Sequence, residues 1–236
     1  MTEWQIKRFW TTATVQPADG GYTITLDARP VRTPARRLLV VPTERMATAI
    51  AAEWDAQANK VDPLTMPVTR GANAAIDKVS AMRDEVVEML LGYGETDLLC
   101  YRADAPEGLV LRQNAGWDPI LDWAGMTFDA PLVSVAGVMH HPQPAYALAN
   151  LAAPVRQMDH FALSGFHDLV ALSGSLVLAL AVTHGRLSAP EAWQLSRIDE
   201  HWQIEQWGAD DEATATESIK RDAFLAAAAF YQMSLT

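Results

Sequence analysis

The stretch SAPEAWQLSRIDEHWQIEQWG, residues 188–208, combines three of the chain's eight tryptophans with four carboxylates. Ser188 and Glu191, three residues apart, form the pattern of a capping box, and Pro190 falls in the first turn, where its missing N–H costs nothing. Gly208 is a typical helix stop. The local signals therefore predict one long helix across the whole stretch.

Two apolar stripes run along this predicted helix at about 100° per residue. Trp202 belongs to one stripe, with Glu205 at its edge, and Trp207 belongs to the other, with Glu200 among its members. Carboxylates set among apolar residues are either paired inside a protein or placed at the rim of a groove that another surface fills. The pattern thus fits either a core helix with solvent-facing acids or a binding site.

The rest of the C-terminal half is also helical in pattern. Apolar residues recur at helical spacing in three further segments, 145–158, 161–183 and 210–233. Gly174, inside the most apolar of these, is expected to allow close approach of a neighbouring helix. Asp118 and Pro119 predict an additional helix start, as cap and first helical residue.

The beginning of the chain has a different pattern. Up to residue 41 the period is near two, and the β-formers in TTATV, YTITL and LLVV are separated by turn residues. A helix follows to about residue 59, with Met46, Ile50 and Trp54 on the face expected to be buried against the sheet. The prolines of VDPLTMP then suggest a linker.

The predicted fold class is therefore α+β. A small N-terminal antiparallel β-sheet domain with a packed helix occupies residues 1–65, and an all-α helical C-terminal domain occupies residues 66–236. With 236 residues, half of them hydrophobic, the chain is long enough to bury a sizeable core.

Composition excludes several classes of protein. The net charge of −11 disfavours nucleic acid, because neutralising phosphates requires positive charge. The most apolar run, residues 169–182, is shorter than the roughly 20 residues that span a bilayer, so we expect no membrane insertion. A single cysteine, Cys100, and an N-terminus without signal-peptide features favour a reducing, cytoplasmic location.

Catalytic and nucleotide-binding motifs are missing from the sequence. It has no phosphate-binding loop, no dinucleotide fingerprint, no serine elbow and no zinc-protease motif. His160 and His167 lie seven residues apart, whereas zinc ligands on a helix lie three or four apart. Cys100 lies in an apolar run without a neighbouring base. We therefore predict no catalytic residue, no nucleotide, no metal and no cofactor.

Five segments in order, LDARPVRTP, EWDAQ with the following VDP, ETDLLCYR, WDPILDWA and LSRIDEHWQIEQWG, resemble the family of F1-ATPase assembly chaperones that attend the alpha subunit. The resemblance covers nearly the whole chain. It implies a non-enzyme with an α+β domain followed by an all-α domain, which binds the unassembled alpha subunit and prevents its aggregation until the beta subunit replaces it. A bacterial member acts in the cytoplasm, and eukaryotic relatives act in the mitochondrial matrix.

Essential acids of that family lie in the C-terminal domain, and the matching candidate here is Glu205, with Asp199 and Glu200 alongside. Trp202 and Trp207 would supply the apolar part of the same client-binding site. We expect the charge of Glu205 to be exposed and to meet hydrogen-bond donors only in the complex.

Two rival functions are a carboxylate- or metal-dependent hydrolase and a non-chaperone adaptor protein. The hydrolase would need converging acids in a closed pocket. The adaptor would bind a folded partner without suppressing aggregation.

Overall fold

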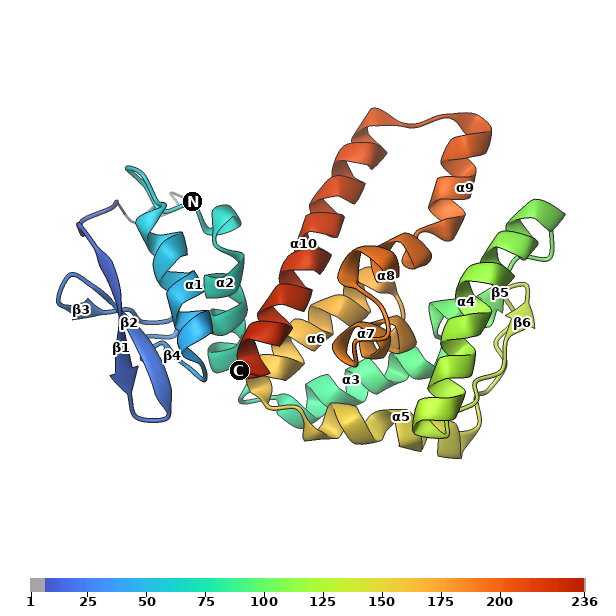
Figure 1. Cartoon of the computed structure of the whole chain (residues 1–236), viewed down its shortest axis with the longest axis horizontal. Coiled ribbons are helices and arrows are strands. Elements are labelled where there is room, and N and C mark those ends of the chain that lie inside the picture. The colour runs from blue at the N-terminus through green and yellow to red at the C-terminus, as the bar shows by residue number, and fades with distance from the viewer. Residues whose placement is uncertain (1–6, 236) are drawn as a thin grey trace. The chain divides into compact units, whose positions relative to one another are not determined.

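The computed structural model describes residues 7–235 and divides the chain into two compact units. The first unit contains Met1–Arg83, Asp159–Gly165 and Ala229–Thr236, and the second contains Asp84–Met158 and Phe166–Ala228. The fold-class prediction is confirmed: a small antiparallel sheet lies near the N-terminus, and the C-terminal part is mostly helical (Figure 1). The boundary after residue 65 stays a prediction.

The sheet of the first unit is built around its second strand. Strand β2 (Gly21–Leu26) pairs antiparallel with β1 (Ala13–Ala18), β3 (Arg29–Pro30) and β4 (Val40–Val41). A Cβ at Gly21 would lie 2.2 Å from the carbonyl oxygen of Val41, so only glycine fits where β2 meets β4. Glycine at this position therefore allows β4 to pair with the start of β2.

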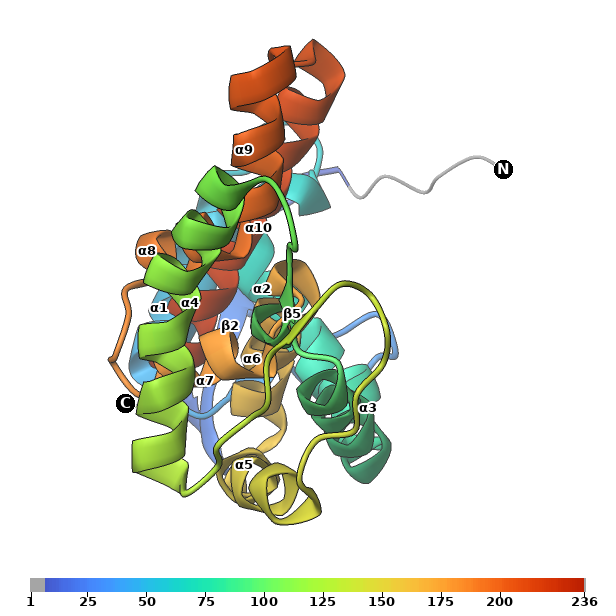
Figure 2. The same ribbon diagram turned by 90° about the vertical axis from the view of Figure 1, so that its right-hand side faces the viewer.

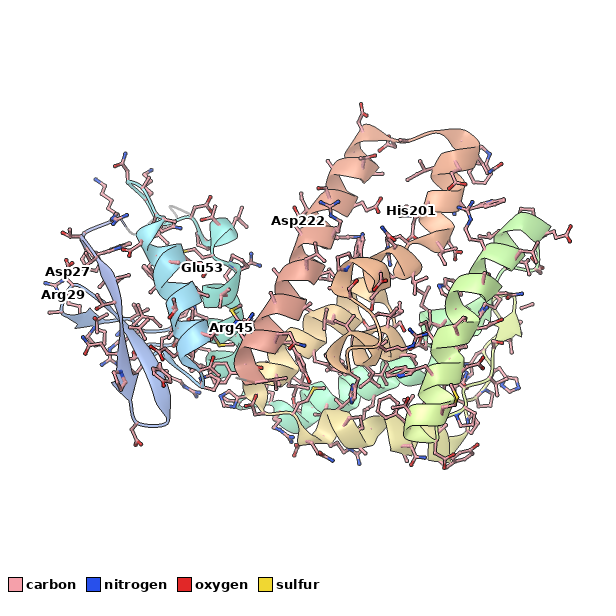
Figure 3. All side chains as sticks on the ribbon, viewed as in Figure 1. Asp27, Arg29, Arg45, Glu53, His201 and Asp222 are labelled. Carbon is pink, nitrogen blue, oxygen red and sulfur yellow. The ribbon has the colours of Figure 1, made fainter. Side chains whose placement is uncertain are left out.

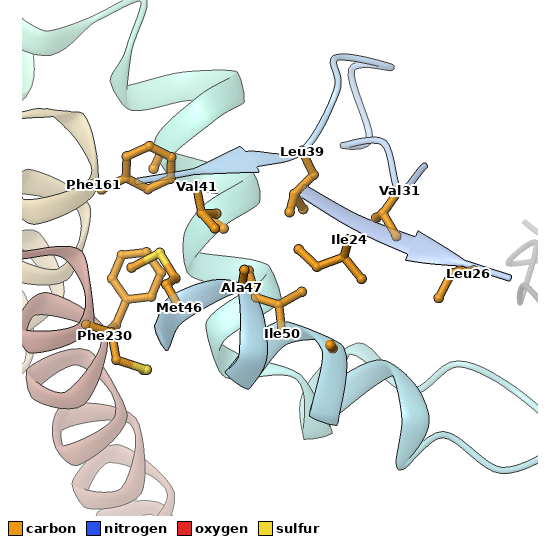
Figure 4. Packing of buried hydrophobic residues seen from close by; sticks show 14 of the residues in the cluster. Ile24, Leu26, Val31, Leu39, Val41, Met46, Ala47, Ile50, Phe161 and Phe230 are labelled. Carbon is orange, nitrogen blue, oxygen red and sulfur yellow. The ribbon is translucent and has the colours of Figure 1, made fainter. Parts of the chain in front are cut away.

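The core of the first unit lies between this sheet and helix α1 (Glu44–Asp55) (Figure 4). Ile24 from the sheet and Met46 and Ile50 from α1 are fully buried, as the four-residue spacing predicted. Trp54 is only partly buried, and it packs edge-on against Trp10 with ring centroids 5.2 Å apart. Three shorter elements follow α1: η1 (Pro63–Thr65), α2 (Pro67–Ala74) and η2 (Ala75–Val79).

Helices dominate the remainder of the chain, with one two-stranded parallel sheet formed by β5 (Tyr101–Arg102) and β6 (Val135–Ala136). The helices are α3 (Arg83–Glu95), η3 (Leu98–Cys100), α4 (Glu107–Phe128), α5 (Ala145–Gln157), α6 (His160–Ser173), α7 (Leu176–Thr183), α8 (Ala189–Ser196), α9 (Ile198–Trp207) and α10 (Asp211–Leu235). Helix α9 lies beside the first half of α4 (Figures 1 and 2).

The prediction of one helix over residues 188–208 is wrong in one respect. The capping box of Ser188 and Glu191 is present, and Gly208 ends the segment at φ 91°. Arg197, at φ −114° and ψ 17°, interrupts it and separates α8 from α9. Periodicity could not locate this break, because the apolar spacing continues across it.

The helix start predicted at Asp118 and Pro119 is also wrong, because α4 runs continuously through both residues. Proline inside a helix removes one hydrogen bond and costs about 3 kcal/mol. Trp117, Ile120 and Leu121, which flank Pro119, are buried on the core side of α4. Their burial offsets that cost and keeps the helix in one piece.

Gly174 has a different role from the one expected. It lies between α6 and α7 at φ 73°, a left-handed conformation that favours glycine, and its carbonyl accepts a hydrogen bond from the Leu98 N–H at 3.2 Å. A Cβ there would meet only one atom within 4.0 Å. The residue is therefore required for a turn and not for close helix packing.

Candidate functional site

Helix α9 separates the five predicted site residues onto two faces. Asp199, Trp202 and Glu205 face α4, whereas Glu200 and Trp207 face a groove between α9 and α10. This division follows from helical geometry, because residues three apart share a face. The structure therefore does not bring the five residues into one cluster.

The α4-facing side chains all have partners on α4. Arg112 donates to both carboxylate oxygens of Glu205, at 2.7 and 2.8 Å, and its guanidinium lies 5.0 Å from the ring centroid of Trp202. The Gln113 side-chain amide donates to Asp199 at 2.6 Å. These contacts form the α4–α9 interface.

Two glycines on α4 allow α9 to come this close. A Cβ at Gly108 would lie 2.6 Å from the Trp202 ring, and a Cβ at Gly116 would lie 2.8 Å from the Ile198 side chain. Gly108, Arg112 and Gly116 are spaced four residues apart and so share one stripe of α4. Sequence reasoning missed this stripe, although small residues flanking an arginine at helical spacing were the signal that could have found it.

The pair formed by Arg112 and Glu205 is open to solvent, with side-chain exposures of 39% and 50%. The hydrogen bond from Arg112 lowers the pKa of Glu205, and the same bond raises the pKa of Arg112. The expectation that Glu205 is exposed is thus correct, and the expectation that it has no donor in the free protein is wrong. A solvated pair of this kind orients α9 more than it stabilises the fold.

The opposite face of α9 borders the α9–α10 groove, which has a volume of about 650 Å³. Buried Trp193 of α8 lies beneath it, and Ile204 and the 79% exposed Trp207 lie along its α9 side. The remaining lining residues are Arg197, Glu200, Gln203, Gly208, Asp210, Glu212, Ala213, Thr216, Glu217 and Lys220. The surface is therefore apolar at intervals and mainly acidic elsewhere.

Hydrogen bonds occupy several polar side chains of this groove. Glu200 accepts a hydrogen bond from Arg197 at 2.8 Å, and His201, on the α10 side of α9, lies 2.8 Å from Glu217 (Figure 3). Asp210 caps α10 by accepting from the Ala213 N–H at 2.8 Å. Of these three contacts, only that between His201 and Glu217 joins α9 to α10, and the other two each lie at the start of one helix. These groups do not converge on a point where a substrate atom would react.

Metal binding and nucleophilic chemistry find no support in the described residues. Within residues 7–235, no three or more His, Cys, Asp or Glu side chains are placed to hold a metal ion. Cys100 is buried, and burial raises the pKa of its thiol to about 12, so it remains protonated at neutral pH. In the same part of the chain, no helix is long and apolar enough to cross a membrane.

Comparison with known proteins gives matches over most of the chain. The family model described as ATP12 chaperone protein matches residues 7–125. The protein atp12, mitochondrial, of Schizosaccharomyces pombe is 25% identical over 220 residues, which cover 88% of this chain and 75% of that protein.

Solved bacterial structures are more similar still. Atp12 from Paracoccus denitrificans is 48% identical with a TM-score of 0.94, covering 97% of this chain and 98% of that one. A protein from Agrobacterium tumefaciens is 43% identical with a TM-score of 0.93, covering 98% of this chain and 87% of that one.

Proposed function

Because the chain belongs to the ATP12 chaperone family, we propose that its client is the unassembled alpha subunit of F1-ATPase. The family identifies it as a chaperone for assembly of the F1 sector of ATP synthase, in agreement with the resemblance of its sequence segments. Binding would prevent aggregation of the alpha subunit until the beta subunit takes its place. The observation that carries the proposal is the exposed Trp207 beside an acidic groove.

An exposed apolar surface fits a chaperone of this kind. Contiguous exposed apolar surface marks interaction sites on soluble proteins, and tryptophan is enriched among the residues that dominate binding energy. Trp207 lines the α9–α10 groove together with Ile204, so its exposed ring belongs to a larger apolar surface. The net charge of −11 opposes self-association of a protein that exposes such a surface. The chain can therefore present Trp207 without a permanent partner.

We assign the five predicted residues two roles in client binding. Glu200 and Trp207 are proposed to contact the client from the groove side of α9. Asp199, Trp202 and Glu205 orient α9 through their contacts with α4. Glu205 is also half-exposed, and we propose that it accepts hydrogen bonds from donors on the client.

We further propose that the protein has no catalytic activity and works in the bacterial cytoplasm. The carboxylates of α9 that a hydrolase would use are bound to Arg112, Gln113 and Arg197, which argues against that rival. The bacterial location is supported by 48% identity to the Paracoccus protein.

Co-purification tests the proposal directly. The alpha subunit of the same organism is expressed with and without this protein, and both capture and light scattering at rising temperature are measured. We expect stable capture and suppressed scattering. Capture without suppression would indicate an adaptor, and the absence of capture would refute the assignment of the client.

A further inference from the structure

We propose that the α9–α10 groove binds one amphipathic helix of the client, with its apolar face toward Trp193, Ile204 and Trp207 and with basic residues along its flanks. This inference rests on the proposed function, because it names the kind of client segment that is recognised. It requires no direct contact between the bound segment and Glu205, which lies on the opposite face of α9.

The dimensions of the groove suit a short helix. Helix α9 has ten residues, and at a rise of 1.5 Å per residue it extends for about 15 Å. A partner helix lying alongside would contribute about three turns, with side chains at i, i+3 or i+4, and i+7 directed into the groove. The apolar residues of the groove come from α8 and from the middle and end of α9, so they too are spread along this length.

The charge of the groove determines the sign of the charge that a bound partner should carry. Glu200, Asp210, Glu212 and Glu217 line it, against Arg197 and Lys220. Glu212 and Lys220 have no hydrogen-bond or ion-pair partner among residues 7–235, so both of these charges remain available, and the lining as a whole has two more acidic than basic side chains. The surrounding second unit strengthens this bias, because its residues include twenty Asp and Glu but only seven Lys and Arg. Complementarity therefore favours lysine or arginine on the flanks of the bound helix.

The groove is fixed in shape before binding. Below it, Trp193 packs on Phe224 of α10 with ring centroids 5.5 Å apart. On the far side of α9, the α4–α9 interface holds the helix through Arg112. Gly208 ends α9 directly after Trp207, which stays on the last turn with 79% of its surface exposed. A surface held in this way loses little conformational freedom on binding.

A model peptide tests the inference without the client. The probe is a labelled 16-residue peptide with leucines on one helical face and lysines elsewhere, titrated against the full chain by fluorescence anisotropy. One comparison peptide carries glutamates in place of the lysines, and another has the same composition in an order that destroys the apolar face. We expect binding of the lysine amphipathic peptide alone.

Variants locate the site of binding. Trp207→Ala is expected to weaken binding of the lysine peptide by about tenfold or more, as for an interface tryptophan that dominates the binding energy. Glu212→Lys is expected to weaken binding less and in a salt-dependent manner. Met126→Ala, which removes another 80% exposed apolar side chain on α4, is the matched control and should bind as wild type. Circular dichroism confirms that each variant is folded.

Several results would overturn the inference. If the scrambled peptide binds equally well, the binding is only non-specific charge attraction. If Trp207→Ala binds the peptide as tightly as wild type, the peptide binds elsewhere on the protein. A dimer in sedimentation that Trp207→Ala dissociates would make a second copy of this chain the occupant. If the peptide does not bind but the protein still protects the alpha subunit from aggregation, only the groove assignment is refuted. If the peptide binds but the alpha subunit is not protected, only the proposed client is refuted.

Discussion

Arg112 on α4 and Glu205 on α9 are joined by two parallel hydrogen bonds of 2.7 and 2.8 Å, although 93 residues separate them in sequence. The bidentate geometry fixes both the distance and the rotation of α9 relative to α4. Glu205, the candidate match for the essential acids of the family, therefore has a local partner. Its proposed contact with the client has to be separated from this role by experiment.

Matched neutral variants separate the two roles. Arg112→Gln and Glu205→Gln each remove one charge from the same pair; glutamine is nearly isosteric with Glu205, and at Arg112 it leaves a shorter polar side chain. Because the pair is solvated, we expect both variants to melt within a few degrees of wild type. If Glu205 contacts the client, only Glu205→Gln loses protection of the alpha subunit, measured by light scattering.

A control and a contrary outcome complete this test. Glu205→Lys should abolish protection, whereas Glu217→Lys, which affects the neighbouring pair with His201, should reduce it much less. Equal loss of protection in Arg112→Gln and Glu205→Gln would mean that Glu205 acts only by orienting α9.

Two helix-interior glycines should respond differently to alanine. A Cβ at Gly92 of α3 would meet nothing within 4 Å, so Gly92→Ala should stabilise the protein by about 0.5–1 kcal/mol through helix propensity. At Gly116 the new methyl would lie 2.8 Å from Ile198 and 3.1 Å from Leu195, so displacement of these side chains should cancel the gain. Urea unfolding measures the free energy of unfolding of both variants. If Gly116→Ala is stabilised as much as Gly92→Ala, the contacts of Gly116 accommodate a methyl group without cost.

Local signals in the sequence predicted the elements that depend on local chemistry. The capping box of Ser188 and Glu191, the stop at Gly208 and the alternating pattern of β1 and β2 all recur in the structure. Each of these features arises from residues within a few positions of one another, where hydrogen bonding and conformational preference act directly.

Features that depend on distant residues could not be predicted in this way. The continuity of α4 through Pro119 depends on burial of its flanking residues in the tertiary fold. The partner of Glu205 lies on another helix, so the composition of α9 alone made the acid look free. The groove face was anticipated only as one of two alternatives, because periodicity places residues on faces without saying what covers them.

Glu53 provides a test of a cap made by a side chain remote in sequence. Its carboxylate accepts hydrogen bonds from the Val68 N–H at 2.7 Å, the Thr69 N–H at 2.8 Å and the Thr69 hydroxyl at 2.6 Å. Helix α2 has no side-chain cap from Met66, so Glu53 on α1 supplies it. Glu53→Ala leaves these donors without their acceptor and should cost about 1–3 kcal/mol in urea unfolding. Glu44→Ala, at an exposed first-turn acid, should cost no more than about 0.5 kcal/mol, and a similar loss in both variants would argue against the cap.

Asp97 joins two helix starts inside the second unit. Its completely buried carboxylate accepts hydrogen bonds from the Leu99 N–H at 3.0 Å, the Ser175 hydroxyl at 2.7 Å and the Val177 N–H at 3.0 Å. It thereby caps η3 and reinforces the start of α7. Burial nevertheless outweighs these donors and raises the pKa of Asp97 from 3.8 to about 6.

The raised pKa has a definite consequence for stability. An acid that holds its proton more tightly in the folded state stabilises the fold below its unfolded pKa, and this contribution is lost as pH rises through the folded pKa. The window for Asp97 therefore runs from about pH 4 to pH 6. A shift of this size corresponds to roughly 3 kcal/mol, since one pKa unit is worth about 1.4 kcal/mol.

Asp97→Asn isolates this effect, because asparagine resembles the protonated acid and does not titrate, while all other carboxylates are shared by both proteins. The free energy of unfolding is measured by urea titration between about pH 4 and pH 7, and the value for the variant is subtracted from that for wild type. We expect this difference to fall by about 2–3 kcal/mol as pH rises over this range, whatever its value at the starting pH. A difference that instead rises with pH would show that the three donors depress the pKa of Asp97 and that its charge, not its proton, holds η3 and α7 together.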